Sequence, residues 1–152
     1  PFHSGIGFYN RETHCLGWNA GRNALPLILV EDVASAIVKA ADATAIDGKT
    51  YNLVGDVRLS AREYIEELAQ ATGRPLRYHP QSVLKLYAIE TAKTVIKKLT
   101  GRTDPWPALR DLRSRGMPAA FDCAAATREL GWVPTSDRQE FLGKSFLADD
   151  GS

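Results

Sequence analysis

The stretch Leu25–Asp42, LPLILVEDVASAIVKAAD, constrains the fold of this chain more than any other. It contains an unbroken apolar run at positions 27–30, which is typical of a strand buried on both faces, as in a parallel or mixed sheet covered by helices. Further apolar residues recur at helical spacing from Val33 to Ala41. We therefore expect a buried strand that turns directly into a helix, which is half of a βαβ unit.

Two acidic residues, Glu31 and Asp32, stand where this strand would meet this helix. The carboxylate of Asp32 can accept a hydrogen bond from an otherwise unpaired N–H of the first helical turn. The position also lies near the carboxyl end of a strand, where open α/β sheets bind ligands. We interpret both residues as a structural strand-to-helix cap, with ligand contact as the alternative.

The next segments continue the same alternation. We expect a strand over Thr50–Val54, a helix opened by a capping box at Ser60 and Glu63, and a further strand over Leu76–His79. The predicted fold class is therefore α/β, with a β-α-β-α-β core over residues 27–79. Helices should follow over Gln81–Thr100, Ala108–Arg115, Ala124–Leu130 and Arg138–Leu147.

Residues 1–24 are rich in glycine and polar residues and lack sustained periodicity, so we expect an irregular segment with one short strand around positions 12–16. Residues 25–148 would form one lobe, and residues 149–152 a disordered tail. The candidate ligand contacts lie in the irregular segment. They are His3, Ser4, Trp18, Arg22 and Asn23. For Trp18, stacking on a base or sugar and covering of the core are both open.

The composition and length exclude several classes of protein. The chain has 152 residues, a net charge of +1 and no apolar run that approaches a membrane span. Its cysteines, Cys15 and Cys123, are too few for a disulfide framework or a zinc site, so we expect reduced thiols and a cytoplasmic location. Neither a bound metal nor a nucleic-acid partner is expected.

No catalytic constellation stands out. There is no glycine-rich phosphate loop between a strand and a helix, and no tyrosine is followed four residues later by a lysine. Cys15 next to His14 has no oxyanion loop behind it, so a nucleophile–base pair is disfavoured. We assign no catalytic and no cofactor-binding residue.

Basic residues accumulate between Lys85 and Arg115, where eight lysines and arginines face three acidic residues. This surplus is compatible with an anionic membrane surface or a polyanion. We favour a solvated helix face instead, because the lysines do not alternate with aromatic residues that would be exposed.

Three of these elements, taken in order, carry a resemblance to a known family. Val30–Ala34, VEDVA, resembles the V-x-D-V-A element of the extended short-chain dehydrogenase/reductases, which include the NAD(P)-dependent epimerases and dehydratases. Gly48–Tyr64 is similar to the strand, turn and helix that follow in that family. Phe121–Pro134 resembles its closing motif, F-D-x-S-K-x-x-x-x-L-G-W-x-P, although alanines stand here at the Ser-Lys positions.

The resemblance implies that this chain is the C-terminal, substrate-binding part of such an enzyme. In the family, an N-terminal Rossmann half supplies the NAD or NADP loop and a Tyr-x-x-x-Lys pair, so this chain should bind no cofactor and catalyse nothing alone. Its ligand would be a small-molecule substrate, such as a nucleotide sugar. Members that bind nucleotide sugars often carry an arginine where Leu25 stands here, and Arg22 is the nearby arginine.

An alternative is a free-standing, non-enzymatic module of the same fold, which binds a ligand or a protein. The two hypotheses differ in one expectation. A lobe cut from a larger sheet should expose an apolar strand or helix face and form homo-oligomers, whereas a free-standing module should be polar there.

Overall fold

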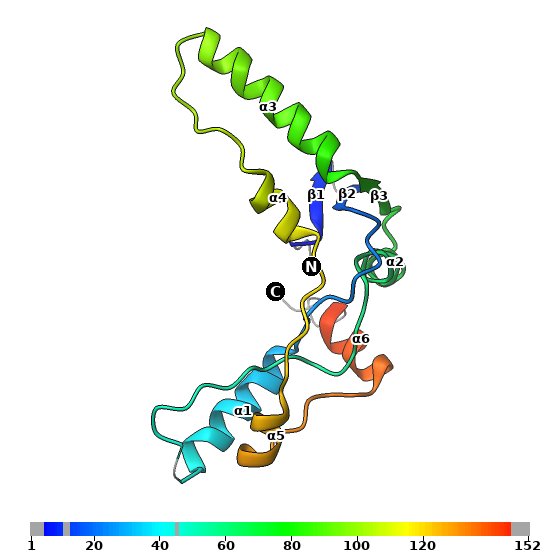
Figure 1. Cartoon of the computed structure of the whole chain (residues 1–152). Helices are drawn as coiled ribbons and strands as arrows, with labels where there is room; N and C mark the ends of the chain where they lie inside the picture. Colours follow the sequence, from blue (N-terminus) through cyan, green and yellow to red (C-terminus); the bar gives the residue numbers. More distant parts are fainter. Residues whose placement is uncertain (1–4, 11–12, 45, 147–152) are drawn as a thin grey trace. The chain divides into compact units, whose positions relative to one another are not determined.

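The computed structural model describes residues 5–10, 13–44 and 46–146, and this part of the chain is a mixed α/β protein with a three-stranded sheet and six helices (Figure 1). The chain forms two compact units. Among the described residues, the first unit consists of Ala24–Leu59 and Ala119–Phe146, and the second consists of residues 5–23 and Ser60–Pro118. The predicted lobe of residues 25–148 thus contributes to both units, which are described separately below.

The sheet lies in the second unit and contains β1 (Gly7–Asn10), β2 (His14–Trp18) and β3 (Arg77–Gln81) in this spatial order. β1 and β2 are antiparallel, and β2 and β3 are parallel. The strand expected around positions 12–16 is β2, and β3 confirms the strand predicted at Leu76–His79 with a small shift. β1 was not predicted, because its four residues are too short a stretch for an alternating pattern to stand out.

Helix α2 (Ala61–Thr72) follows its local sequence signals closely. Ser60 Oγ accepts a hydrogen bond from the N–H of Glu63 at 3.3 Å, and Glu63 Oε2 accepts one from the N–H of Ser60 at 2.8 Å. The predicted capping box is therefore confirmed. One face of the helix supplies the core of this unit with Tyr64, Ile65 and Leu68.

The packing of β2 against β3 depends on one aromatic side chain, Tyr78. Its hydroxyl donates a hydrogen bond to the carbonyl oxygen of Trp18 at 3.1 Å, and its ring lies directly over Gly17 and Gly21. A Cβ atom at either glycine would collide with that ring. Gly21 also has a φ of +66°, which side chains disfavour. The tyrosine and the two glycines therefore fix the path of the chain as it leaves β2.

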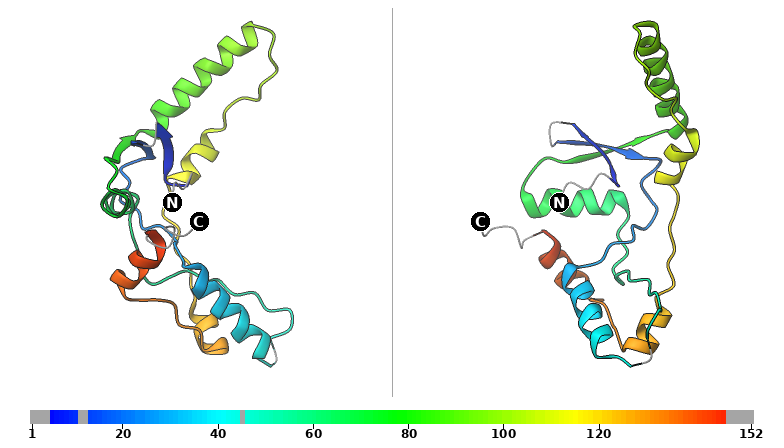
Figure 2. Two further views of the ribbon diagram at one scale, coloured as in Figure 1. Left: turned by 180° about the vertical axis from the view of Figure 1, so that it is seen from behind. Right: turned by 90° about the vertical axis from the view of Figure 1, so that its left-hand side faces the viewer.

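Helices α3 (Val83–Leu99) and α4 (Leu109–Arg115) complete the second unit and contact each other. Both helices were predicted, with ends within two residues of those observed. α3 follows β3 directly and extends away from the sheet (Figure 2). Only Val83 and Thr94 of α3 are buried, so most of its length has little cover from the described residues.

The first unit contains α1 (Val30–Asp42), α5 (Ala124–Leu130) and α6 (Arg138–Phe146), all of which were expected from the sequence. α1 packs against α5. The ring of Trp132 is fully buried between these two helices and fills the centre of the core. The buried residues around it are Ala36, Ala126 and Leu130.

The strands predicted over 27–30 and over Thr50–Val54 do not form, and these predictions were wrong. Residues 27–29 and Thr50–Val54 have no regular secondary structure, and one hydrogen bond runs from the N–H of Gly55 to the carbonyl oxygen of Leu27, at 2.8 Å. Val30 belongs to α1 and is 75% exposed, so the run is not buried on both faces. Two paired segments without a third strand are only marginally stable, which explains the missing ladder. Of the predicted β-α-β-α-β core, both helices and the last strand remain.

Asp32 does not cap α1, and the interpretation of Glu31 and Asp32 as a cap is corrected. The N-cap residue is Leu29, with no side-chain hydrogen bond. The carboxylate of Asp32 is buried and accepts two hydrogen bonds from Thr135, one from its N–H and one from its hydroxyl, both at 3.0 Å. The carbonyl oxygen of Asp32 also accepts a bond from the indole N–H of Trp132 at 2.8 Å. Glu31 is exposed. Asp32 therefore joins α1 to the segment after α5.

We predict that Asp32→Ala lowers the free energy of unfolding by about 1–3 kcal/mol, because it leaves two partly buried donors of Thr135 without an acceptor. The matched control is Glu31→Ala, in the same helical turn but exposed, for which we expect a change within about 0.5 kcal/mol. Urea unfolding followed by tryptophan fluorescence measures both. Equal effects of the two substitutions would contradict the role of the Asp32 carboxylate.

Candidate functional site

A turn at the end of β2 brings polar side chains together in the second unit. Asn19 has a φ of +52°, and its Nδ2 donates a hydrogen bond to the carbonyl oxygen of Gly116 at 3.0 Å. The Nδ2 of Asn23 donates to the same oxygen at 2.8 Å. Gly116 has no room for a Cβ atom, because that atom would collide with the Asn19 amide. Two amides from one turn are thus fixed against the end of α4.

Trp18 lies beneath this turn and is only 4% exposed. Phe8 packs edge-on against its ring at a centroid distance of 5.1 Å, and the Arg115 guanidinium lies 5.3 Å from the ring centroid. The covered ring acts as support for the turn rather than as a free stacking surface. Its indole N–H is buried and finds no hydrogen-bond acceptor among the described residues. A buried donor without an acceptor costs about 1–3 kcal/mol, so a bound acceptor there would be favoured.

Arg62, in the first turn of α2, holds the backbone of this turn in place. Its Nε donates a hydrogen bond to the carbonyl oxygen of Ala20 at 2.6 Å, and its guanidinium lies 5.5 Å from the ring centroid of Tyr78. Its own N–H donates to the carbonyl oxygen of Gly21 at 3.1 Å. Arg22 points its exposed side chain to solvent from this fixed backbone. The turn is therefore a pre-formed platform, which lowers the entropic cost of binding.

A cavity of about 460 Å³ adjoins the platform, within the second unit. Its lining combines one amide, one hydroxyl, one guanidinium and three apolar side chains. Its lining consists of Asn19, Ser82, Val83, Leu84, Arg113 and Met117. None of these lining residues is acidic, so the cavity is suited to an anion with an apolar or sugar-like portion.

A second cavity, of about 320 Å³, lies within the first unit. Asp56 and Asp122 line it together with Arg58 and the ring of Trp132. Two carboxylates beside one guanidinium disfavour an anionic ligand. Of these two cavities, the one in the second unit therefore offers the better anion site.

Two histidines meet on neighbouring strands of the sheet. His14 Nδ1 and His79 Nε2 are 2.8 Å apart and share a hydrogen bond. Two ligands alone make a weak metal site. Across residues 5–10, 13–44 and 46–146, no group of three or more His, Cys, Asp or Glu side chains is arranged to hold a metal ion.

Cys15 is the other residue with nucleophilic chemistry in this unit, and its environment opposes that role. The side chain is fully buried. Burial raises the pKa of the Cys15 thiol to about 11, although a hydrogen bond with Tyr9 acts in the opposite direction. The thiolate is the reactive form, so this cysteine is held inert at neutral pH.

The sequence-predicted site residues have different positions in the structure. Trp18 and Asn23 meet at the end of α4, as described above, whereas Arg22 is exposed and Asp32 is part of the core of the first unit. His3 and Ser4 lie outside the described residues. The sequence alone did not indicate five further residues of this site, which are Asn19, Arg62, Arg113, Arg115 and Gly116. The one local signal was Gly116, a glycine directly after the basic last turn of α4.

No model of a known protein family matches the chain, and no curated protein matches it either. Within the described part of the chain, every helix is too short or too polar to cross a membrane.

We predict that iodoacetamide at pH 8 leaves Cys15 unmodified in the native protein and modifies it only after addition of denaturant. The raised pKa and the lack of exposure both slow the reaction. Cys123 is partly exposed and serves as the internal control, so it should react first. Peptide mass spectrometry distinguishes the two sites. Equal reaction of both cysteines in the native protein would contradict the burial of Cys15.

Proposed function

We propose that this chain is the substrate-binding portion of an NAD(P)-dependent nucleotide-sugar epimerase/dehydratase-like oxidoreductase, and that it does not catalyse the reaction alone. The sequence lacks the Tyr-x-x-x-Lys pair and the glycine-rich loop that the extended short-chain dehydrogenase/reductases use. Hydride transfer needs the nicotinamide and an acid/base residue beside it, so both would have to come from a Rossmann half.

The contact between two of the family-like motifs supports this proposal. Asp32 is the acidic residue of the V-x-D-V-A-like element, and Trp132 belongs to the L-G-W-x-P-like element. They bond across a sequence separation of 100 residues, and Thr135 adds two further bonds. The two motifs thus act as one structural unit, which gives a physical reason for their occurrence together.

The single observation that carries the proposal is the exposed part of the apolar face of α1. One edge of this face packs on the Trp132 core, through Ala36 and Ala40. The rest of the same face is exposed, with Val30 at 75%, Ile37 at 63% and Val38 at 61%. An amphipathic helix is expected to bury its whole apolar face against another layer, and the described residues cover only one edge of it. A sheet of a Rossmann half is the layer that the resemblance implies.

The cavity beside the turn supports a phosphate-bearing substrate. Arg113 can form charge-assisted hydrogen bonds with a diphosphate, and the lining around it is free of carboxylates. Val83, Leu84 and Met117 offer the apolar wall that a base or sugar needs. The amide of Asn19 lies at the rim, in a fixed orientation.

We expect uridine diphosphate to bind the chain, and uridine to bind at least tenfold more weakly, because the diphosphate provides the charged contact. Arg113→Gln should weaken the binding of uridine diphosphate by at least about tenfold. Arg110→Gln is the matched control, since Arg110 is an exposed arginine of the same helix outside the cavity lining. Isothermal titration calorimetry measures the affinity of the unsubstituted chain for both ligands and of the two variants for uridine diphosphate. Equal binding of uridine and its diphosphate, or equal effects of the two substitutions, would contradict this site.

We also expect the isolated chain to self-associate through α1 and to bind an apolar dye. Ile37→Gln combined with Val38→Gln should shift it toward monomer and reduce the dye signal, because it removes the exposed apolar face. Lys39→Gln, on a polar face of the same helix, should change neither. Sedimentation velocity gives the mass. A monomeric parent chain without dye binding would instead favour the free-standing, non-enzymatic module.

A further inference from the structure

One face of helix α3 is apolar and exposed to solvent. With 100° of rotation per residue, one set of side chains covers a continuous arc of the helix, and each of them is exposed. We call this set the outer face of α3. It consists of Leu84, Ala88, Ile89, Ala92, Val95, Ile96 and Leu99. Leu99 is 82% exposed, Ile96 62% and Leu84 60%. A solvated surface helix would carry polar residues there, so this face is expected to be covered.

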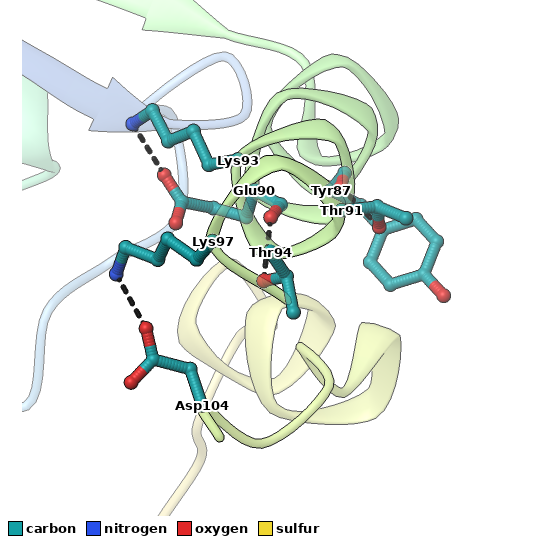
Figure 3. Close-up of polar contacts among 7 residues, drawn as sticks. All are labelled: Tyr87, Glu90, Thr91, Lys93, Thr94, Lys97 and Asp104. Atoms are coloured by element: carbon teal, nitrogen blue, oxygen red, sulfur yellow. Dashed lines mark hydrogen bonds and ion pairs between the residues drawn. The ribbon is translucent and has the colours of Figure 1, made fainter. Parts of the chain in front are cut away.

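Several polar side chains of α3 lie outside the outer face, and Figure 3 shows their contacts. Lys93 pairs with Glu90 and Lys97 pairs with Asp104, each at 2.8 Å. The hydroxyl of the buried Thr94 donates to the carbonyl oxygen of Glu90 at 2.9 Å. These polar contacts do not cover the outer face, whose side chains remain exposed.

The charge around the outer face is strongly positive. Residues 83–117 carry eight lysines and arginines against three acidic residues, although the whole chain has a net charge of only +1. Lys85 lies within the outer face, and Lys93 and Lys98 flank it on either side. Long lysine stems can lie along an apolar surface while their ammonium groups reach outward. An occupant of this face therefore meets both apolar and cationic groups.

An exposed tryptophan completes this surface and changes the interpretation made from the sequence. Trp106 follows α3 in the loop before α4 and is 59% exposed. The ammonium group of Lys98 lies 5.3 Å from its ring centroid. The sequence analysis favoured a solvated face because no exposed aromatic residue was expected among the lysines. The structure supplies one, and tryptophan is enriched at the boundary between lipid and water.

We propose that the outer face of α3, together with Trp106, binds the surface of an anionic phospholipid membrane, with the helix lying in the plane of the interface. Apolar residues enter the boundary between headgroups and acyl chains, and the surrounding lysines and arginines attract anionic lipid headgroups. α3 is not apolar enough to cross a membrane, so it would rest on one leaflet. A second copy of this face is a less suitable occupant, since it would bring the same positive charge against itself.

Flotation of the 152-residue chain with lipid vesicles tests the proposal. The chain should bind vesicles of equal parts phosphatidylglycerol and phosphatidylcholine at least tenfold more strongly than vesicles of phosphatidylcholine alone, and added salt should reduce this preference. Brominated lipids should quench part of the tryptophan fluorescence, and Trp106→Phe should remove that part.

Ile96→Gln combined with Leu99→Gln should weaken binding to the anionic vesicles by at least about tenfold, because it removes two apolar side chains from the interface. Both residues are exposed, so the fold should persist, which circular dichroism verifies. The control is Val133→Gln, which removes an exposed apolar side chain (69% exposed) outside the faces of α1 and α3 and should leave vesicle binding unchanged.

Four results would overturn the proposal. The first is no binding to either vesicle. The second is equal loss of binding in Ile96→Gln with Leu99→Gln and in Val133→Gln. The third is stronger binding to a soluble polyanion such as heparin that Ile96→Gln with Leu99→Gln does not affect. The fourth is self-association through α3 without lipid binding.

Discussion

The buried carboxylate of Asp32 is the interaction on which the first unit depends. It joins α1 to a residue that is 103 positions away, and the backbone of Asp32 holds the indole of Trp132 in the core. A buried acidic group is costly unless it is hydrogen-bonded, and Thr135 provides two donors. This interaction also joins two segments that are about 100 positions apart in the sequence.

The second unit depends on a different constraint, the close approach of backbone to the ring of Tyr78. Because Gly17 and Gly21 have no side chains, the backbone after β2 can pass close to the ring of Tyr78. Arg62 of α2 holds this backbone through its hydrogen bond to the carbonyl oxygen of Ala20. The amides of Asn19 and Asn23 are consequently directed at the end of α4. A cavity with one guanidinium and no carboxylate results beside this turn.

Two helices leave apolar faces uncovered, and the charges around them point to different occupants. α1 carries three acidic residues and one lysine, whereas the segment of α3 and α4 carries a surplus of positive charge and an exposed tryptophan. The face of α1 suits a neutral protein layer, such as the sheet of a Rossmann half. The face of α3 suits an anionic lipid surface. Both ideas rest on the same principle, that contiguous exposed apolar area implies a partner.

The sequence by itself determined the elements whose signals are local. The capping box at Ser60 and the six described helices followed from hydrogen bonds and spacings within a few residues. A strand forms only when a neighbouring segment pairs with it. The strands predicted at 27–30 and Thr50–Val54 are absent, because only one hydrogen bond connects this part of the chain, from Gly55 to Leu27. Only the tertiary structure decided that Asp32 binds Thr135 instead of capping its helix, that Trp18 is buried and that Arg113 lines a cavity. Each of these facts depends on contacts between residues about 60 to 100 positions apart, and the amino-acid pattern within one segment carries no information about such contacts.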